Sequence, residues 1–521
     1  MAFGMVTAAR EQSPVIDEVT YVGAAVVYAT RHDLQINPEH PPLGKLLSAV
    51  GLAFTDVRLD PPVHSNQTRI GVQVLYEEGN DADWLLFLAR LPMIILTVLV
   101  GLVVFVFGRD LVGSTGGLVG LGLYAFSPDV IAHGSLATND VPLAGFLLTS
   151  AWLLWRARRR PERYLPLAAL AFGCALATKM TALVVFPVFV LLAGLSVWHA
   201  GRRATPVLVR QRVLSIAVAG VLFGALAIAT VWVTYLVVDP RLRFTTPPNA
   251  ASVNGLMDLA VSLVPLPEAY RDGLLVQVTM ERRFSGAYLF GHHYDHSPWY
   301  YLPAAVLVKT PLGMLLLWAA GVATLVGVRR VRPAVPYVLL PIGLLFLVSL
   351  AGDRGFGVRY VIWLPVFLAV AAAATVVHRR RRRWVLPAVL ALVALTGVSS
   401  LRTFPYYLPY ANEAFGGPSQ TYRHLSDANV DWGQDLRRLG IYLNERWPGE
   451  PVWLIYKGRG DPEYYGIRAR DALKVPPEQV HGLLAVSVTR IDNRNPRYAV
   501  LIGDRTPIAV IGHSIRVYRL P

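Results

Sequence analysis

An adjacent pair of acids and a histidine–lysine run are the residues of this chain best suited to chemistry. Asp17 and Glu18 stand side by side, and His40 and Lys45 follow in the run His40-Pro41-Pro42-Leu43-Gly44-Lys45. A carboxylate can take a proton from a hydroxyl group, and an imidazole and an ammonium group can hold an anion such as a phosphate. Acids at a helix start also cap the helix and favour its positive dipole end, so a structural role for Asp17 and Glu18 stays open.

Three more charged residues stand beside apolar runs. Asp140 follows Asn139 at the head of a run, Lys179 separates two runs, and Arg359 begins another. Asp140 is a candidate to bind a metal or orient a substrate, although an acid at this place could only favour the helix dipole. The lysines and Arg359 suit an anionic lipid phosphate, and interfacial snorkelling explains them equally well. Lysine is rare in this chain, with five in all, and three of them fall in such settings: Lys45, Lys179 and Lys309.

A histidine-rich run gives a second kind of candidate site. Gly291-His292-His293-Tyr294-Asp295-His296 holds three imidazoles and a carboxylate, which is typical of a metal cluster, although the spacing is unspecific. A loop with histidines at the membrane interface explains the same pattern. The metal candidates are therefore His292, His293 and His296, or Asp17 and Asp140.

The elements that position these residues are predicted to cross a membrane. Hydrophobic residues make up 54% of the 521 positions and charged residues 16%, and the apolar residues fall in long runs. This composition predicts a polytopic α-helical membrane protein. We expect ten spans, with ends uncertain by a few residues, at about 85–107, 111–131, 140–155, 164–178, 180–198, 213–238, 300–327, 334–351, 358–377 and 384–401. Before them, Val19, Val22 and Val26 recur at helical spacing and predict a helix on the membrane surface that carries Asp17 and Glu18.

Basic clusters between the spans predict the orientation. The formal charge is +15, but the arginines are grouped in alternate connections, which indicates cytoplasmic loops rather than nucleic-acid binding. The clusters are Arg156–Arg163, Arg202–Arg212, Arg329–Arg332 and Arg379–Arg383. The first loop (17–83), the long loop (239–299) and the candidate site residues then share the extracytoplasmic side of a plasma membrane. Polar chemistry at one boundary favours an enzyme over a channel, whose ionisable residues would follow the membrane depth.

The composition changes after residue 401. Residues 1–401 are expected to form the transmembrane module, and residues 402–521 a soluble α/β domain. Its pattern predicts a helix over 434–446, strands over 452–456 and 481–491, and an edge hairpin or final strand over 508–520. No phosphate loop or nucleophile motif stands in it, so we expect it to bind or shield an acceptor. The single cysteine, Cys174, excludes an intrachain disulfide.

The order of these motifs resembles a known family. Asp17-Glu18, the His40–Lys45 run, Asn139-Asp140 and Lys179 are similar to the dolichyl-phosphate-mannose protein mannosyltransferases and their bacterial relatives, including the lipid A aminoarabinose transferases. Three further segments look like uncharacterised bacterial members of the group: Pro298–Leu312, Arg359-Tyr360 and Asp427–Leu436.

The resemblance implies a GT-C glycosyltransferase that uses a polyprenyl-phosphate-linked sugar and inverts the anomeric carbon. It implies Asp17 as general base, Glu18 and Asp140 as positioners of an acceptor or metal, and a set of donor-phosphate binders: His40, Lys45, Lys179 and Arg359. A divalent metal is not uniformly required in the family. The acceptor could be a protein, a lipid or an envelope polysaccharide. A non-catalytic transporter or flippase of lipid-linked sugars is the alternative.

The start of the chain departs from the family pattern. A full apolar helix precedes the Asp-Glu pair in the resembled family, whereas only Met1–Ala9 stands before a polar Arg10-Glu11-Gln12 here. The arginine clusters require the Asp17 region to be outside. A chain that starts in the cytoplasm needs a span before Asp17 to place this region outside, and the ten expected spans all follow it. We therefore expect one further span upstream of Met1, with Met1–Ala9 as its outer end; the alternative is that the protein exports its N-terminus without that helix.

Overall fold

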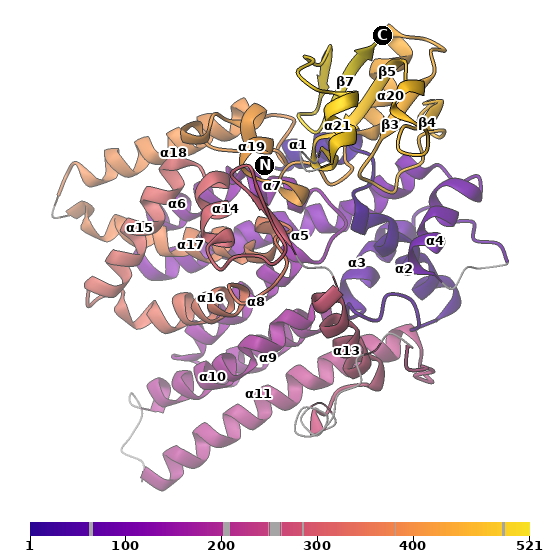
Figure 1. Cartoon of the computed structure of the whole chain (residues 1–521). Helices are drawn as coiled ribbons and strands as arrows, with labels where there is room; N and C mark the ends of the chain where they lie inside the picture. The colour runs from indigo at the N-terminus through magenta and orange to yellow at the C-terminus, as the bar shows by residue number, and fades with distance from the viewer. Residues whose placement is uncertain are drawn as a thin grey trace.

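The helical body carries most of the chain, and a small sheet domain lies at one end of it (Figure 1). The computed structural model describes residues 1–61, 66–201, 209–247, 250, 261, 263–283, 286–380, 382–491 and 495–521. Parts of the expected long loop 239–299 and of the clusters Arg202–Arg212 and Arg379–Arg383 lie outside these residues. The chain is therefore mostly helical with a C-terminal α/β sheet, as predicted.

Five helical segments within the described residues are long and apolar enough to cross a bilayer. They are α5 (Ala82–Val112), η2 with α10 (Met180–Gly201), α11 (Val209–Val238), η3 with α16 (Arg332–Ser349) and α18 (Val385–Arg402). A sixth is α14 (Tyr301–Lys309) with α15 (Leu312–Gly327), if this pair, bent by 118°, is one span.

The expected count of ten spans is thus not confirmed. Prolines explain two of the differences, because the residue before a proline is disfavoured in a helix. Pro311 separates α14 from α15, and Pro128 begins α7 (Pro128–Gly134) where one continuous span was expected over 111–131. The other helices of the body are α6 (Ser114–Ala125), α8 (Asp140–Ala157), α9 (Pro161–Thr178), α13 (Glu268–Arg283) and α17 (Trp363–Ala373).

The N-terminal helices pack on α5 or on one another. They are α1 (Ala2–Glu11), α2 (Ile16–Arg31), α3 (Leu43–Leu52), α4 (Gln67–Val72) and the π-helical turn η1 (Gln73–Glu77). The expected helix after Asp17 is confirmed as α2. Its residues from Glu18 to Tyr28 are all buried, and helices α3 and α4 cover it. Protein therefore surrounds Glu18, whereas the Asp17 side chain is 26% exposed. The place of this helix at the membrane surface stays a prediction.

The C-terminal domain contains a five-stranded sheet in the order β4-β3-β5-β7-β6. The strands are β3 (Val452–Ile455), β4 (Ala469–Asp471), β5 (Gly482–Ser487), β6 (Ala509–Ile511) and β7 (Ile515–Leu520). Strands β3, β4 and β5 are parallel, whereas β7 pairs antiparallel with β5 and β6. Helix α20 (Leu436–Arg446) packs its buried leucines on this sheet. The predicted helix, the two inner strands and the final hairpin are confirmed, and the short β4 was missed.

Candidate active site

Asp17 and Arg359 form the centre of the site. Asp17 is the second residue of α2, and Arg359 lies in the single turn η4 (Val358–Val361). Arg359 Nη1 donates to Asp17 Oδ2 at 2.6 Å, and the guanidinium carbon lies 4.3 Å from the ring centre of Trp432. The Asp17 side chain is 26% exposed, and its second oxygen, Oδ1, has no hydrogen bond within the described residues. One carboxylate oxygen is therefore held in place and the other is open.

Asp140 and Lys179 form a second ion pair at the same site. Asp140 begins α8, and Lys179 lies in the break between α9 and η2. Lys179 Nζ is 2.5 Å from Asp140 Oδ1. The ring of Tyr360 joins the two pairs, since Lys179 Nζ lies 5.6 Å and the Arg359 guanidinium carbon 5.2 Å from its centre. Residues distant in the sequence thus meet as two adjacent ion pairs.

His40 lies next to both pairs. Its ring stands edge-on to Tyr21, one turn after Asp17, with 5.4 Å between the ring centres, and its Nδ1 is buried without a hydrogen-bond partner. Burial lowers the pKa of His40 well below its usual value, and the charges of Lys179, Lys45 and Arg359 lower it further. The imidazole is therefore neutral near pH 7, with one nitrogen available to a ligand.

Lys45 holds the loop that carries His40. Its buried ammonium donates to the carbonyls of Asn37 at 2.8 Å and His40 at 2.6 Å, and to the Asn37 side chain at 3.2 Å. Burial lowers the pKa of Lys45 to about 7. The three hydrogen bonds of this ammonium all go to the loop of Asn37 and His40, so Lys45 holds this loop in place.

Glu18 is directed away from Asp17, into the protein. Its carboxylate pairs with Arg90 of α5 at 2.6 Å, and both side chains are fully buried. The same carboxylate accepts from the backbone of Ala137 at 2.7 Å and of Val15 at 3.0 Å. Sequence reasoning missed Arg90, although an arginine inside the run Leu86–Met93 was a visible signal. Glu18 is thus saturated with hydrogen bonds, whereas Asp17 is not.

The C-terminal domain contributes directly to the site. The Trp432 carbonyl accepts from the backbone of Ile16, and the Ser13 hydroxyl donates to the Gly433 carbonyl, so the segment 432–434 fixes the start of α2. Asn429 accepts from the backbone of Val358 at 3.0 Å, which fixes the turn that carries Arg359. Buried Lys309 donates to the carbonyls of Leu408 and Asn429. Lys309 therefore holds the tail in place instead of facing the site.

The candidate metal ligands do not come together. His292 and His293 lie on β2 (His292–Tyr294), which pairs with β1 (Ala287–Leu289), and neighbours on a strand point to opposite faces. His296 lies beside Asp353 at 3.6 Å. Within the described residues no group of three or more histidine, cysteine, aspartate or glutamate side chains could share a metal ion. Asp17 and Asp140 each form an ion pair with a basic side chain, Arg359 and Lys179.

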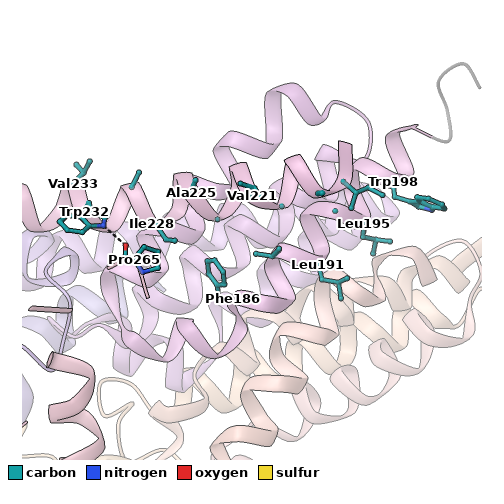
Figure 2. Close-up of a pocket in the computed structure, with 17 residues that line it drawn as sticks. Phe186, Leu191, Leu195, Trp198, Val221, Ala225, Ile228, Trp232, Val233 and Pro265 are labelled. Carbon is teal, nitrogen blue, oxygen red and sulfur yellow. Dashed lines mark hydrogen bonds between the residues drawn. The ribbon is translucent and has the colours of Figure 1, made fainter. Parts of the chain in front are cut away.

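An apolar groove about 1300 Å³ in volume lies along α10 and α11 (Figure 2). Its lining includes Phe186, Leu195, Trp198, Val221 and Trp232, and Trp232 donates to the carbonyl of Pro265. Many of these side chains are exposed, which is typical of a surface that faces lipid. The groove reaches Phe186, one short helical segment after Lys179.

Comparison with protein families gives one match. The family model of the dolichyl-phosphate-mannose-protein mannosyltransferases matches residues 5–238, a little under half of the chain. The expected family resemblance is thereby confirmed over this segment. The mannosyltransferase-like segment contains Asp17, Glu18, His40, Lys45, Asp140 and Lys179, whereas Arg359 and Trp432 lie beyond it. A search of curated proteins finds no significant match.

Two groups of solved structures are similar in overall arrangement. ArnT from Cupriavidus metallidurans, bound to undecaprenyl phosphate, has 13% identity and a TM-score of 0.45, with 99% of this chain and 96% of that chain covered. The oligosaccharyltransferase AglB from Archaeoglobus fulgidus, in complex with an inhibitory peptide and a dolichol-phosphate, has 11% identity and a TM-score of 0.47, with 94% and 67% covered. At this level of similarity neither structure supports an inference about substrates.

Proposed function

We propose that this chain is a membrane glycosyltransferase that moves a sugar from a polyprenyl-phosphate donor to an acceptor hydroxyl group on the extracytoplasmic side of the plasma membrane. The observation that carries the proposal is the Asp17–Arg359 pair, in which one carboxylate oxygen is held at 2.6 Å and the other is open. The family match over residues 5–238 supports the same reaction class.

Asp17 acts as the general base. Its open Oδ1 takes the acceptor proton while the acceptor oxygen attacks the anomeric carbon from the side opposite the phosphate, and the configuration is inverted. The bond between the anomeric carbon and the phosphate oxygen breaks, and its electron pair stays on the phosphate. A phosphate leaves without protonation, so no second carboxylate is needed as an acid. This requirement agrees with a site in which Glu18 is buried and paired, whereas Asp17 has an open oxygen.

Cations and a neutral imidazole stabilise the leaving group. Lys179 and Arg359 flank Tyr360, and electrostatic stabilisation by fixed charges is commonly the largest contribution to such a step. His40 adds a neutral ring whose buried Nδ1 is unpaired. Asp140 keeps Lys179 in position. Glu18 and Lys45 act as positioning residues for α2 and for the His40 loop.

The groove of Figure 2 suits the hydrocarbon part of such a donor. The six residues of η2 separate Lys179 from Phe186 at the groove, a distance of about 12 Å at the ~2 Å rise of a 3₁₀ helix. A polyprenyl chain is long enough to have its phosphate near Lys179 and its isoprene units along α10 and α11. This placement is part of the proposal, as are the sugar, the acceptor and the membrane orientation.

A transfer assay tests the proposal. Purified full-length protein in detergent is given polyprenyl-phosphate sugars and candidate acceptors, and the release of free polyprenyl phosphate is measured together with the glycosylated product. We expect both products to appear in equal amounts. Movement of the intact lipid-linked sugar across vesicles without bond cleavage would instead support a transporter.

A further inference from the structure

Arg459 reaches from the C-terminal domain to the helix that carries Asp17. It follows β3, and its Nη1 donates to the hydroxyl of Thr20 at 3.0 Å and of Thr68 at 2.6 Å. Thr20 is three residues after Asp17 on α2, so it lies on the same side of that helix. The Arg459 guanidinium therefore bridges α2 and α4 beside the proposed base.

The loop is closely packed at the two glycines that flank Arg459. Side-chain atoms at Gly458 would lie 2.0 Å from the Tyr456 ring, and at Gly460 3.0 Å from Leu436. Tyr456 itself donates to the Gly433 carbonyl at 2.6 Å, next to Trp432. The loop that presents Arg459 is thus packed on the same segment that fixes the start of α2.

Arg459 differs from the other cations of the site in having no carboxylate partner within the described residues. Arg359 pairs with Asp17, Lys179 with Asp140 and Arg90 with Glu18. The two hydrogens of Arg459 Nη1 are used by threonine hydroxyls, whereas Nε and Nη2 have no hydrogen bond to a described residue. Those two nitrogens form the edge of a guanidinium that binds phosphate or carboxylate through two parallel hydrogen bonds.

We propose that Arg459 binds the phosphate of the lipid-linked donor through this Nε–Nη2 edge, so that the C-terminal domain completes the donor site. The inference rests on the proposed function. Arg359 and Lys179 each form an ion pair with a carboxylate, Asp17 and Asp140, whereas the Asp17 charge acts on Arg459 without an ion pair. An anion of the donor supplies this ion pair. The negative charge on the phosphate increases when the sugar leaves, so the contact strengthens as the bond breaks.

A binding experiment separates this inference from the proposed function. Polyprenyl phosphate and uncharged polyprenol of the same length are each titrated into the purified full-length chain in detergent, with no turnover required. The variants are R459Q, which removes the charge, and R459K, which keeps a positive charge but lacks the two-nitrogen edge of the guanidinium. R69Q is the matched control, since Arg69 is on α4 beside Thr68, is exposed and pairs with Glu77.

The wild type and R69Q are expected to bind polyprenyl phosphate more tightly than polyprenol. In R459Q we expect about tenfold weaker binding of the phosphate, the loss of one charge-assisted contact, with polyprenol binding unchanged. R459K is expected to fall between them, and it decides the question if R459Q does not fold. If folded R459Q and R459K prefer polyprenyl phosphate over polyprenol as strongly as the wild type does, Arg459 does not bind the phosphate. Equal binding of both lipids by the wild type would contradict the proposed donor itself.

An anionic acceptor is the other possible source of the charge. If R459Q binds polyprenyl phosphate as the wild type does but needs a higher concentration of an acidic acceptor for transfer, the phosphate assignment is wrong. A lower maximal rate with unchanged polyprenyl phosphate binding would also contradict it, because a donor-phosphate contact must appear in the affinity for the product.

Discussion

Glu18 and Arg90 form an ion pair with no exposed surface, and Arg90 also donates to the carbonyls of Ala9, Gln12 and Ser13. The pair therefore ties three segments together: α1, the start of α2 and the long helix α5. Asp17, the residue before Glu18 on α2, is directed to the site because its neighbour is anchored in the opposite direction. An adjacent Asp-Glu pair thus combines one open carboxylate with one that positions it.

Replacement of Glu18 by glutamine is expected to lower the stability of the N-terminal helices. Removal of one partner leaves a buried guanidinium uncompensated, which costs about 3–5 kcal/mol. The thermal unfolding midpoint in detergent measures the loss, and the double variant E18Q/R90Q should recover part of it. If E18Q unfolds like the wild type but loses transfer, Glu18 has a chemical role and the positioning role is wrong.

Gly44 is expected to tolerate no side chain. A methyl group there would lie 1.9 Å from the Asn139 side-chain oxygen, so Gly44→Ala must displace the buried Asn139 side chain or the His40 loop. We expect a loss of about 1–3 kcal/mol in stability and a loss of transfer. Gly343→Ala is the control, because a methyl group at Gly343 meets no atom within 4 Å. Equal behaviour of the two variants would show that the close approach to Asn139 is unimportant.

Asp431 makes the stability of the C-terminal domain depend on pH. Burial raises the pKa of this carboxyl to about 7, although the Lys457 charge and the Gly433 backbone oppose the rise. In the unfolded chain its pKa is about 3.9, so the folded state binds the proton more tightly. The stabilisation is complete below about pH 4 and is lost as the pH rises through about 7. Denaturant unfolding of D431N should lack this part of the wild-type pH dependence, and an unchanged dependence would contradict the assignment.

The sequence singled out the candidate site residues, but it did not show their partners. Asp17, His40, Asp140, Lys179 and Arg359 stood out because charged or polar groups are rare beside apolar runs. Their pairing depends on contacts between distant segments, 39 residues apart for Asp140 and Lys179 and 342 for Asp17 and Arg359, and no local spacing encodes such contacts. For the same reason the buried setting of Glu18 and Lys45 was not visible.

The fold was predictable to a similar extent. Apolar runs gave the helical body, and alternating patterns gave most of the C-terminal sheet, because both depend on local periodicity. The number of membrane spans could not be predicted from the sequence, since helices broken at Pro128 and Pro311 keep the apolar composition of a span. The contribution of the tail was also missed: the run Asp427–Leu436 was noted as a motif, but its contacts with residues 13–16 arise only in the folded chain.

The most direct test of the account is the transfer rate of Asp17→Asn. Asparagine keeps an oxygen that can accept from Arg359 but cannot take the acceptor proton. We predict a loss of transfer of about a hundredfold or more, with polyprenyl phosphate binding and the unfolding midpoint close to those of the wild type. Asp56→Asn, at an exposed acid of the same N-terminal region, should transfer at the wild-type rate. Transfer by Asp17→Asn within a few-fold of the wild type would contradict the role of Asp17 as the base.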